Sequence, residues 1–325
     1  MTQHDAWLSE LARAQEVLPV EHFVPLTLIG PAIIEWGTDE QRQRYLPGIA
    51  SGEDMWCQLF SEPGAGSDLA SLATRAVPSG NGGWVVDGQK VWSSFADISR
   101  YAMLLARTDP DVPKNAGITC FLLDMRSAGV TVRPLRQMTG SEHFCEVFLE
   151  GVELSADTML GALNDGWRVT LSTLTAERSG LSSDSAASGV ELDPVLALAR
   201  RTGAWADEVV RDRLAALIAT ERALTLTNQR FEVAPDAKGS ITKLLQSELS
   251  QRISELGFEI AGPAGAYWDG DSEPAETHAL LDSRRLTVAG GTSEIQRNII
   301  AERVLGLDRE PDLERGRPWR ELRRG

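Results

Sequence analysis

The sequence lacks any run of 18 or more apolar residues, which excludes an ordinary membrane-spanning helix. Its start carries Asp5 and Glu10 and lacks a basic-then-apolar signal pattern, so no secretory leader is expected. Cysteine is scarce: Cys57, Cys120 and Cys145 lie far apart without a C-x-x-C spacing. Neither a disulfide framework nor a metal site is therefore expected. We predict a cytoplasmic protein whose cysteines pack as small apolar residues.

Positive charge is also in short supply. Lys and Arg number 32 against 47 Asp and Glu, which gives a net charge of −15. So acidic a chain has no general attraction for nucleic acid or anionic lipid, and an anionic substrate needs a local basic cluster. The 325 residues are 42% hydrophobic and 24% charged, as in ordinary globular proteins. Length favours two domains and leaves one or three open.

The order of expected elements is helices, then strands, then helices, which predicts an α+β fold with segregated elements. Near the start, Thr38 is a candidate cap for a helix that ends near Pro47. The turn Asp87-Gly88 predicts a hairpin, and several short strands between Trp56 and Leu160 favour a small barrel or sandwich. Long helices are expected from Trp167 onward and at residues 193–201, 204–230, 242–260 and 281–305, the last interrupted at Gly290-Gly291.

The first candidate site is the loop Ser61–Asp68, with the sequence Ser-Glu-Pro-Gly-Ala-Gly-Ser-Asp. Two glycines and a proline fix a tight, exposed path whose N–H groups can meet a ligand closely. It lacks the Gly-Lys-Ser/Thr of a phosphate loop. By composition alone, an ordinary helix-to-sheet linker explains it equally well.

The second candidate is the stretch Gly290–Arg297. Ser293 and Gln296 have capping-box spacing, so a helix is expected to start there and to run to Gly306. The two preceding glycines leave first-turn N–H groups uncovered, where a ligand oxygen can bind. A well-capped helix of any bundle has the same pattern.

The third candidate is the pair Glu177-Arg178. Trp167, Leu171 and Leu174 form the apolar stripe of a helix, and both charged residues flank that stripe. Partial burial raises the proton affinity of a carboxylate and suits a general base. Periodicity alone leaves an ordinary edge ion pair as the favoured alternative.

Together these stretches resemble the acyl-CoA dehydrogenases, a flavoenzyme family, from about Gly37 to Leu307. Three markers in family order carry the resemblance: Gln58–Asp68, Gly88–Ser94 and Gly291–Arg297. The resemblance implies a shortened helical N-terminal domain, a middle β-barrel, a C-terminal four-helix bundle and a tail. The corresponding boundaries are 1–55, 56–160, 161–310 and 311–325.

The resemblance also implies the cofactor FAD and a role in lipid metabolism. By family position, the flavin contacts are Phe60, Ser61, Gly66, Ser67, Trp92 and Ser94. Residues expected to reach the FAD of a partner subunit are Glu259, Gly262, Thr292 and Glu294. Substrate contacts are expected from Ser67 and Arg297.

The implied reaction is α,β-dehydrogenation of an acyl-CoA thioester to the 2-enoyl-CoA, with the β-hydride passing to flavin N5. Many members carry the base directly before the Gly-Thr-Ser marker, but Gly290 stands there in this chain. Others place it in a Glu-Arg pair on a bundle helix, so Glu177 becomes the expected base and Arg178 its orienting partner. The backbone N–H near Gly290 is expected to stabilise the thioester oxygen.

Expected partners are acyl-CoA, an electron-transfer flavoprotein and further subunits in a homo- or hetero-oligomer. The family's Arg-x-x-Phe-Gly stretch has only Arg201-Thr202-Gly203 as a stand-in, and the N-terminal helical domain is short. Both features favour the alternative of a half-site or non-catalytic subunit in a heteromer. An oxidase or flavin-dependent oxygenase on the same fold stays open.

Overall fold

The structure is a computed structural model that describes residues 20–180, 191–230, 235–267, 274–312 and 314–322. The chain forms two compact units. The first unit comprises Met1–Leu135, Glu142–Thr173 and Glu314–Gly325, and the second comprises Arg136–Ser141 and Leu174–Leu313. Within the described ranges, no helix is long and apolar enough to cross a membrane.

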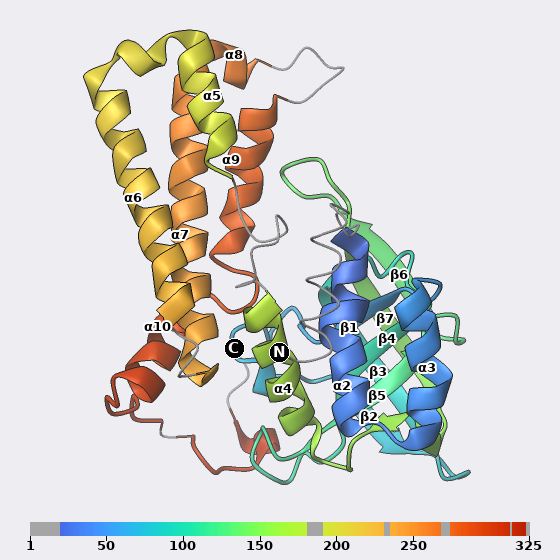
Figure 1. Cartoon of the computed structure of the whole chain (residues 1–325). Coiled ribbons are helices and arrows are strands. Elements are labelled where there is room, and N and C mark those ends of the chain that lie inside the picture. The colour runs from blue at the N-terminus through green and yellow to red at the C-terminus, as the bar shows by residue number, and fades with distance from the viewer. Residues whose placement is uncertain (1–19, 181–190, 231–234, 268–273, 313, 323–325) are drawn as a thin grey trace. The chain divides into compact units, whose positions relative to one another are not determined.

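A single sheet dominates the first unit (Figure 1). Its strands are β1 (Trp56–Leu59), β2 (Arg75–Pro78), β3 (Trp84–Ser94), β4 (Tyr101–Arg107), β5 (Ile118–Asp124), β6 (Val130–Leu135), β7 (Phe144–Leu154) and β8 (Met159–Leu160). Their order is β6-β7-β3-β2-β4-β5-β8, and β1 pairs with β4 in parallel. The predicted α+β class is confirmed.

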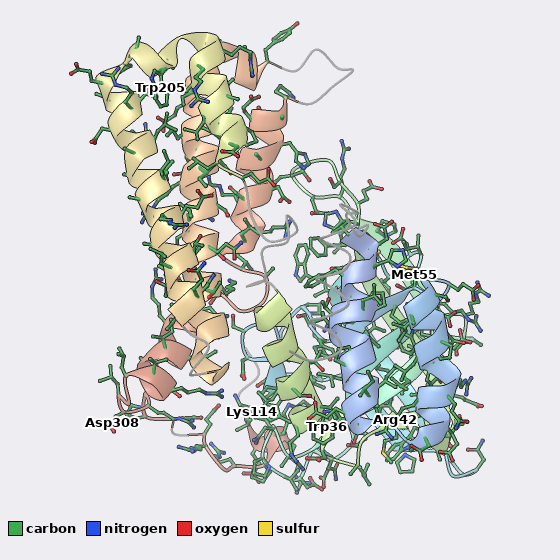
Figure 2. All side chains as sticks on the ribbon, in the orientation of Figure 1. Trp36, Arg42, Met55, Lys114, Trp205 and Asp308 are labelled. Atoms are coloured by element: carbon green, nitrogen blue, oxygen red, sulfur yellow. The ribbon has the colours of Figure 1, made fainter. Side chains whose placement is uncertain are left out.

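Two helices, α2 (Gly30–Trp36) and α3 (Asp39–Ser51), lie side by side near the sheet (Figure 1). Their apolar side chains share one buried cluster with those of β1, β4 and β5. A second cluster fills the opposite side of the same strands, which explains why β4 and β5 read as continuous apolar runs. Figure 2 shows Trp36 and Arg42 at the same end of the two helices, where Arg42 Nε donates to the carbonyl of Ile34.

The predicted cap of α3 is confirmed, since Thr38 and Gln41 form a reciprocal capping box. The predicted end at Pro47 is wrong, because the helix continues through Pro47 to Ser51 and ends at Gly52 with φ +75°. Proline removes one donor, but the helix still carries the buried side chains of Tyr45 and Ile49.

The expected hairpin at Asp87-Gly88 is also wrong. β3 runs unbroken from Trp84 to Ser94 and pairs along its length with β7, with a register shift between Val86 and Gly88. A Cβ at Gly88 would lie 2.3 Å from Thr74 Oγ1. The glycine therefore serves a bulge and a close approach of strands, not a turn.

The second unit is a helical bundle around α7 (Figure 1). Its helices are α5 (Asp193–Thr202), α6 (Glu208–Arg230), α7 (Pro235–Ala261), α8 (Pro263–Ala266), α9 (Ala275–Leu286) and α10 (Ser293–Ile299). The core of the bundle is formed by apolar residues of α5, α6 and α7. Trp205 lies at the corner between α5 and α6 (Figure 2).

The helix α4 (Gly166–Gly180) begins in the first unit and ends in the second. Short turns complete the fold: 3₁₀ segments η1 (Val20–His22), η3 (Leu69–Ser71), η4 (Ala156–Thr158), η5 (Ala204–Ala206) and η8 (Trp319–Glu321), and π segments η2 (Val24–Ile29) and η7 (Ile300–Val304).

Candidate functional site

A small hollow of ≈ 60 Å³ in the first unit brings together four residues that the sequence assigns to one site. It is lined by Val24, Gln58, Phe60, Ser61, Val91, Trp92 and Ser94. Phe60 and Ser61 follow the end of β1, and Trp92 and Ser94 lie at the end of β3. The Val91 N–H donates to the Ser61 carbonyl at 2.9 Å, which joins the two segments.

Trp92 has an unusual backbone and an exposed ring. Its φ is +60°, and that of nearby Phe95 is +58°, a left-handed conformation that is uncommon for bulky residues. The Trp92 side chain is 60% exposed and its ring meets Phe144 edge-on at 6.0 Å. Such strain gathers at ligand sites, and an exposed indole face beside a hollow suits a planar aromatic ligand.

Gln58 is a lining residue that the sequence argument did not assign. Its Nε2 is buried, and no described residue accepts a hydrogen bond from it. The signal was available, because Gln58 stands two residues before Phe60 and side chains at that spacing along a strand share a face. A buried donor without an acceptor is costly, so this atom indicates a ligand oxygen or ring nitrogen in the hollow.

The start of the Ser61–Asp68 loop is held by a buried ion pair. Glu62 and Ala65 exchange two backbone hydrogen bonds, and Lys90 Nζ lies 2.8 Å from Glu62 Oε1. Lys90 Nζ also donates to the Phe60 carbonyl at 3.0 Å. Lys90 thus links Glu62, within the loop, to Phe60, the residue directly before the loop.

The ionisation of this pair follows from its surroundings. Burial opposes the charge on Glu62, but the Lys90 ammonium and the N–H groups of Ala73 and Thr74 outweigh burial, so the pKa of Glu62 lies below its ordinary value. Burial lowers the pKa of Lys90, and the Glu62 carboxylate partly offsets that effect. The carboxylate is therefore ionised at neutral pH.

Farther along the loop the backbone is open. A Cβ built on Gly64 or Gly66 would meet nothing within 4 Å, and Ser67 is exposed. Nothing within the described chain therefore demands glycine at these two positions. An open, uncovered backbone is what a closely approaching ligand needs. Gly66 and Ser67 do not line the hollow, and their ligand roles stay predictions.

In the second unit, the stretch Gly290–Arg297 has the expected helix start, but the cap lies one residue earlier than predicted. Thr292 Oγ1 accepts from the Ile295 N–H at 3.2 Å, so Thr292 is the cap and Ser293 the first helical residue. Gly290 and Gly291 have φ values of +65° and +89°. The left-handed glycines direct the chain so that the threonine, not the serine, reaches the cap position.

A second hollow, of ≈ 440 Å³, lies beside this helix start. It is lined by Glu248, Gln251, Thr287, Val288, Thr292, Ser293, Glu294 and Arg297. Ser293 Oγ and Gln296 Oε1 are buried without a hydrogen-bond partner among the described residues. Three predicted residues, Thr292, Glu294 and Arg297, therefore come together.

The charges at this hollow are mixed. Arg297 forms an ion pair with Glu248, and its other terminal nitrogen lies 3.9 Å from Glu294. The pKa of Glu294 is lowered by hydrogen bonding to its own backbone N–H and to Thr292. Two carboxylates already offset the Arg297 charge, so a substrate phosphate must compete with them.

Glu259 and Gly262 are not brought together with Thr292 and Glu294. They lie at the end of α7, where Glu259 is held by Arg213 and Gly262 has φ +58°. Glu248, which pairs with Arg297, is eleven positions earlier on the same helix, a rise of about 16 Å. The sequence grouped these residues by family position, which is silent on their spacing within one chain.

The predicted base lies on α4, whose backbone includes residues 177 and 178. The side chains of Glu177 and Arg178 fall outside the described part of the structure. Gly290, the alternative base position, carries no side chain. The assignment of Glu177 and Arg178 stays a prediction.

Three family models match the chain in sequence order. They are the acyl-CoA dehydrogenase N-terminal domain at residues 1–53, middle domain at 57–152 and C-terminal domain at 164–305. The chain belongs to the acyl-CoA dehydrogenase family. Residues 306–325 lie outside all three matches.

The chain is similar to two acyl-CoA dehydrogenases of Mycobacterium tuberculosis. It is 43% identical to FadE34 over 286 residues, which cover 86% of this chain and 39% of that protein. It is 41% identical to IpdE1 over 312 residues, 94% of this chain and 80% of that protein. The chain thus spans well under half of FadE34 and most of IpdE1.

Solved structures agree with the family. The "Tcur3481-Tcur3483 steroid ACAD" matches with a TM-score of 0.82 and 31% identity, over 89% of this chain and 77% of that chain. The ChsE4-ChsE5 complex from Mycobacterium tuberculosis matches with a TM-score of 0.77 and 29% identity, over 94% of this chain and 81% of that chain. Acyl-CoA dehydrogenases are flavoprotein oxidoreductases, and their cofactor is FAD.

The residues of the first unit fit a flavin. The exposed Trp92 ring offers a face, the buried Gln58 Nε2 offers a free donor, and Phe60 and Ser61 line the same hollow. The expectation of FAD, made from the three sequence markers, is confirmed at the family level. Individual contacts stay predictions.

Proposed function

We propose that this acyl-CoA dehydrogenase oxidises an acyl-CoA thioester to the 2-enoyl-CoA with Glu177 as its catalytic base. Bound FAD would supply the two-electron oxidant that removal of the β-hydrogen as hydride requires. The α-proton passes to the Glu177 carboxylate, and an electron-transfer flavoprotein reoxidises the cofactor. The proton, the hydride and the new double bond balance in this scheme.

One observation carries the proposal: the hollow lined by Phe60, Ser61, Trp92 and Ser94 with the unpartnered donor Gln58. All five residues lie in the first unit. A buried donor without an acceptor and an aromatic side chain at the same hollow are features that suit a flavin ring.

The assignment of the base rests on the family resemblance, which implies a base in a Glu-Arg pair on a bundle helix, here Glu177-Arg178. Gly290, the other family position, carries no acid or base, and residue 177 belongs to the backbone of α4. Arg178 is assigned an orienting role. Ser67 and Arg297 are assigned to substrate, and the backbone N–H near Gly290 to the thioester oxygen, whose growing charge needs a donor.

The decisive variant is Glu177→Gln, compared with the wild type under anaerobic conditions with a panel of acyl-CoA thioesters. The panel includes straight, branched and bulky steroid-like acyl groups. We expect FAD to stay bound while the rate of flavin bleaching falls by about 10² to 10⁴. Unchanged bleaching would remove Glu177 from the mechanism. Oxygen uptake with substrate would favour an oxidase.

A half-site subunit of a heteromeric enzyme is the second candidate. It is supported by two similar structures that each contain a pair of proteins, Tcur3481-Tcur3483 and the ChsE4-ChsE5 complex. It is also supported by Glu259, a predicted cross-subunit contact whose carboxylate is engaged by Arg213. Fewer than one FAD per chain after purification alone, restored with a co-expressed partner, would favour this candidate. One FAD per chain with turnover would favour a homomer.

A further inference from the structure

The segment from Glu314 to Leu322 docks on the first unit and lies outside the family match. We call it the tail segment. Its Trp319 N–H donates to the Val112 carbonyl at 2.9 Å, and its Arg320 N–H donates to the Pro110 carbonyl at 3.1 Å. A bridge between Pro318 and Pro113 continues this pairing. The tail segment thus adds backbone pairing to the loop between β4 and β5.

The tail segment also places an indole on a buried cation. The Arg107 guanidinium lies 4.7 Å from the centre of the Trp319 ring, and Arg107 is only 3% exposed. Trp319 Nε1 donates to the Ser71 carbonyl at 3.3 Å. An aromatic face on a desolvated guanidinium stabilises its charge, whereas water cannot easily reach this group. Trp319 therefore covers one side of Arg107.

Arg107 in turn donates hydrogen bonds to the backbone that follows the Ser61–Asp68 loop. Its Nη2 donates to the carbonyls of Ala70 at 2.6 Å and Leu72 at 3.2 Å, and its Nη1 donates to the Lys114 carbonyl at 2.5 Å. Burial lowers the pKa of Arg107 to about 10, so it is a cation at neutral pH. These three carbonyls have a charged donor only while Arg107 keeps this position.

The side chains of two residues whose carbonyls accept from Arg107 or Trp319 contact Asp68, the last residue of the loop. Lys114 Nζ lies 2.7 Å from Asp68 Oδ1, and Ser71 Oγ donates to Asp68 Oδ2 at 2.5 Å. The loop is therefore held at its start by Lys90 and Glu62 and at its end by Asp68. Between these anchors lie the open glycines, whose conformation is set by where the two ends are fixed.

We propose that the tail segment is a clamp that holds the Ser61–Asp68 loop in its FAD-binding conformation, with Trp319 as the positioning residue. Trp319 acts through Arg107 and the Ala70–Leu72 backbone and does not itself touch the cofactor. The proposal rests on the assignment of this loop to FAD. It predicts that a residue far along the chain from the flavin hollow controls cofactor affinity.

The test compares Trp319→Ala, Trp319→Phe and the wild-type full chain by titrating FAD into the apoprotein and following flavin fluorescence. We expect Trp319→Ala to raise the Kd at least about fivefold, the equivalent of one lost cation–π contact. Trp319→Phe keeps an aromatic face and should recover most of the affinity. The matched control is Trp205→Ala, which removes a similar stack on Arg200 in the second unit and should leave the Kd unchanged.

Two further measurements test whether the tail segment holds the loop, even if Trp319→Ala is less stable than the wild type. A chain truncated after Leu313 should bind FAD weakly, and a synthetic peptide of residues 314–325 should restore affinity in trans. Amide hydrogen exchange at Ser71 and Leu72 should quicken in Trp319→Ala and not in Trp205→Ala. Equal Kd values for wild type and Trp319→Ala, or equal losses in both alanine variants, would overturn the clamp.

A wrong assignment of the loop to FAD and a wrong assignment of the tail segment as a clamp give different results. If the wild-type chain binds no FAD, the assignment of the loop to FAD fails, and exchange at Ser71 and Leu72 alone decides whether Trp319 positions this backbone. If the wild type binds FAD and the variants bind it equally well, the flavin assignment stands and the clamp is wrong.

Discussion

Lys90 Nζ lies 2.8 Å from Glu62 Oε1, and the two side chains are 0% and 8% exposed. The pair joins the middle of β3 to the first turn of the Ser61–Asp68 loop. Because Lys90 also donates to the Phe60 carbonyl, one ammonium group fixes both a loop residue and a residue that lines the hollow beside Trp92. Its removal is therefore expected to affect the fold and the site together.

Replacing Lys90 by Met should lower the free energy of unfolding by about 3 kcal/mol, because Glu62 is left as a buried carboxylate without its cation. Urea denaturation of the apoprotein measures this loss. The control is Lys114→Met, which breaks an ion pair with Asp68 whose side chains are 34% and 57% exposed. That variant should lose less than about 1 kcal/mol, and equal losses would contradict a special role for Lys90.

The stabilisation by Glu62 should depend on pH in the acid range. Its pKa in the folded chain lies below the ordinary 4.5, so its contribution is complete above that value and is lost as the pH falls through the folded pKa. Glu62→Gln should therefore be clearly less stable than wild type at pH 7. The gap should shrink below about pH 4.5, as measured by denaturation at each pH. A gap that is constant with pH would show that ionisation of Glu62 is not the cause.

Gln58→Leu should separate binding of the cofactor from stability of the fold. The buried Nε2 has no acceptor among the described residues, so leucine should leave the apoprotein as stable or more stable. The FAD Kd should rise by about fivefold to tenfold, because a hydrogen bond to the ligand is lost. Fluorescence titration measures the Kd. Gln89→Leu is the control, since Gln89 bonds Glu146 away from the hollow and should leave the Kd unaltered.

Thr292 should act as a helix cap whatever its role toward a ligand. Thr292→Ala removes the acceptor for the Ile295 N–H and should lower the free energy of unfolding by about 1 kcal/mol. Thr292→Ser keeps the oxygen and should retain most of that stability. A thermal melt compares the three proteins, and an alanine variant as stable as wild type would exclude the cap as a stabilising contact.

Much of the fold is visible in the order and spacing of residues. The capping box at Thr38, the apolar runs of β4 and β5 and the long helices around α7 are local patterns, and a local pattern determines a local backbone. The Asp87-Gly88 turn signal failed because β7 pairs with both sides of it. The partner strand lies about sixty positions later, and no local rule contains it.

The candidate site likewise combines residues that motifs predicted with an arrangement that only the tertiary structure shows. Phe60, Ser61, Trp92 and Ser94 were assigned from motifs, and their meeting around one hollow depends on the placement of β1 and β3 in one sheet. The spacing of Gln58 from Phe60 was visible in the sequence, but only the tertiary structure shows that its amide is buried without a partner among the described residues. Glu259 and Thr292, grouped by family position, prove to lie at different levels of one bundle.

The sequence by itself determined the family, the cofactor and the element order, because these depend on residue types at fixed spacings. Tertiary structure alone decided that Lys90 is buried against Glu62, that Trp92 takes a left-handed backbone, and that Trp319 covers Arg107. Each depends on contacts between distant segments. Burial and the free-energy cost of leaving a charge or donor unpartnered arise only when those segments meet.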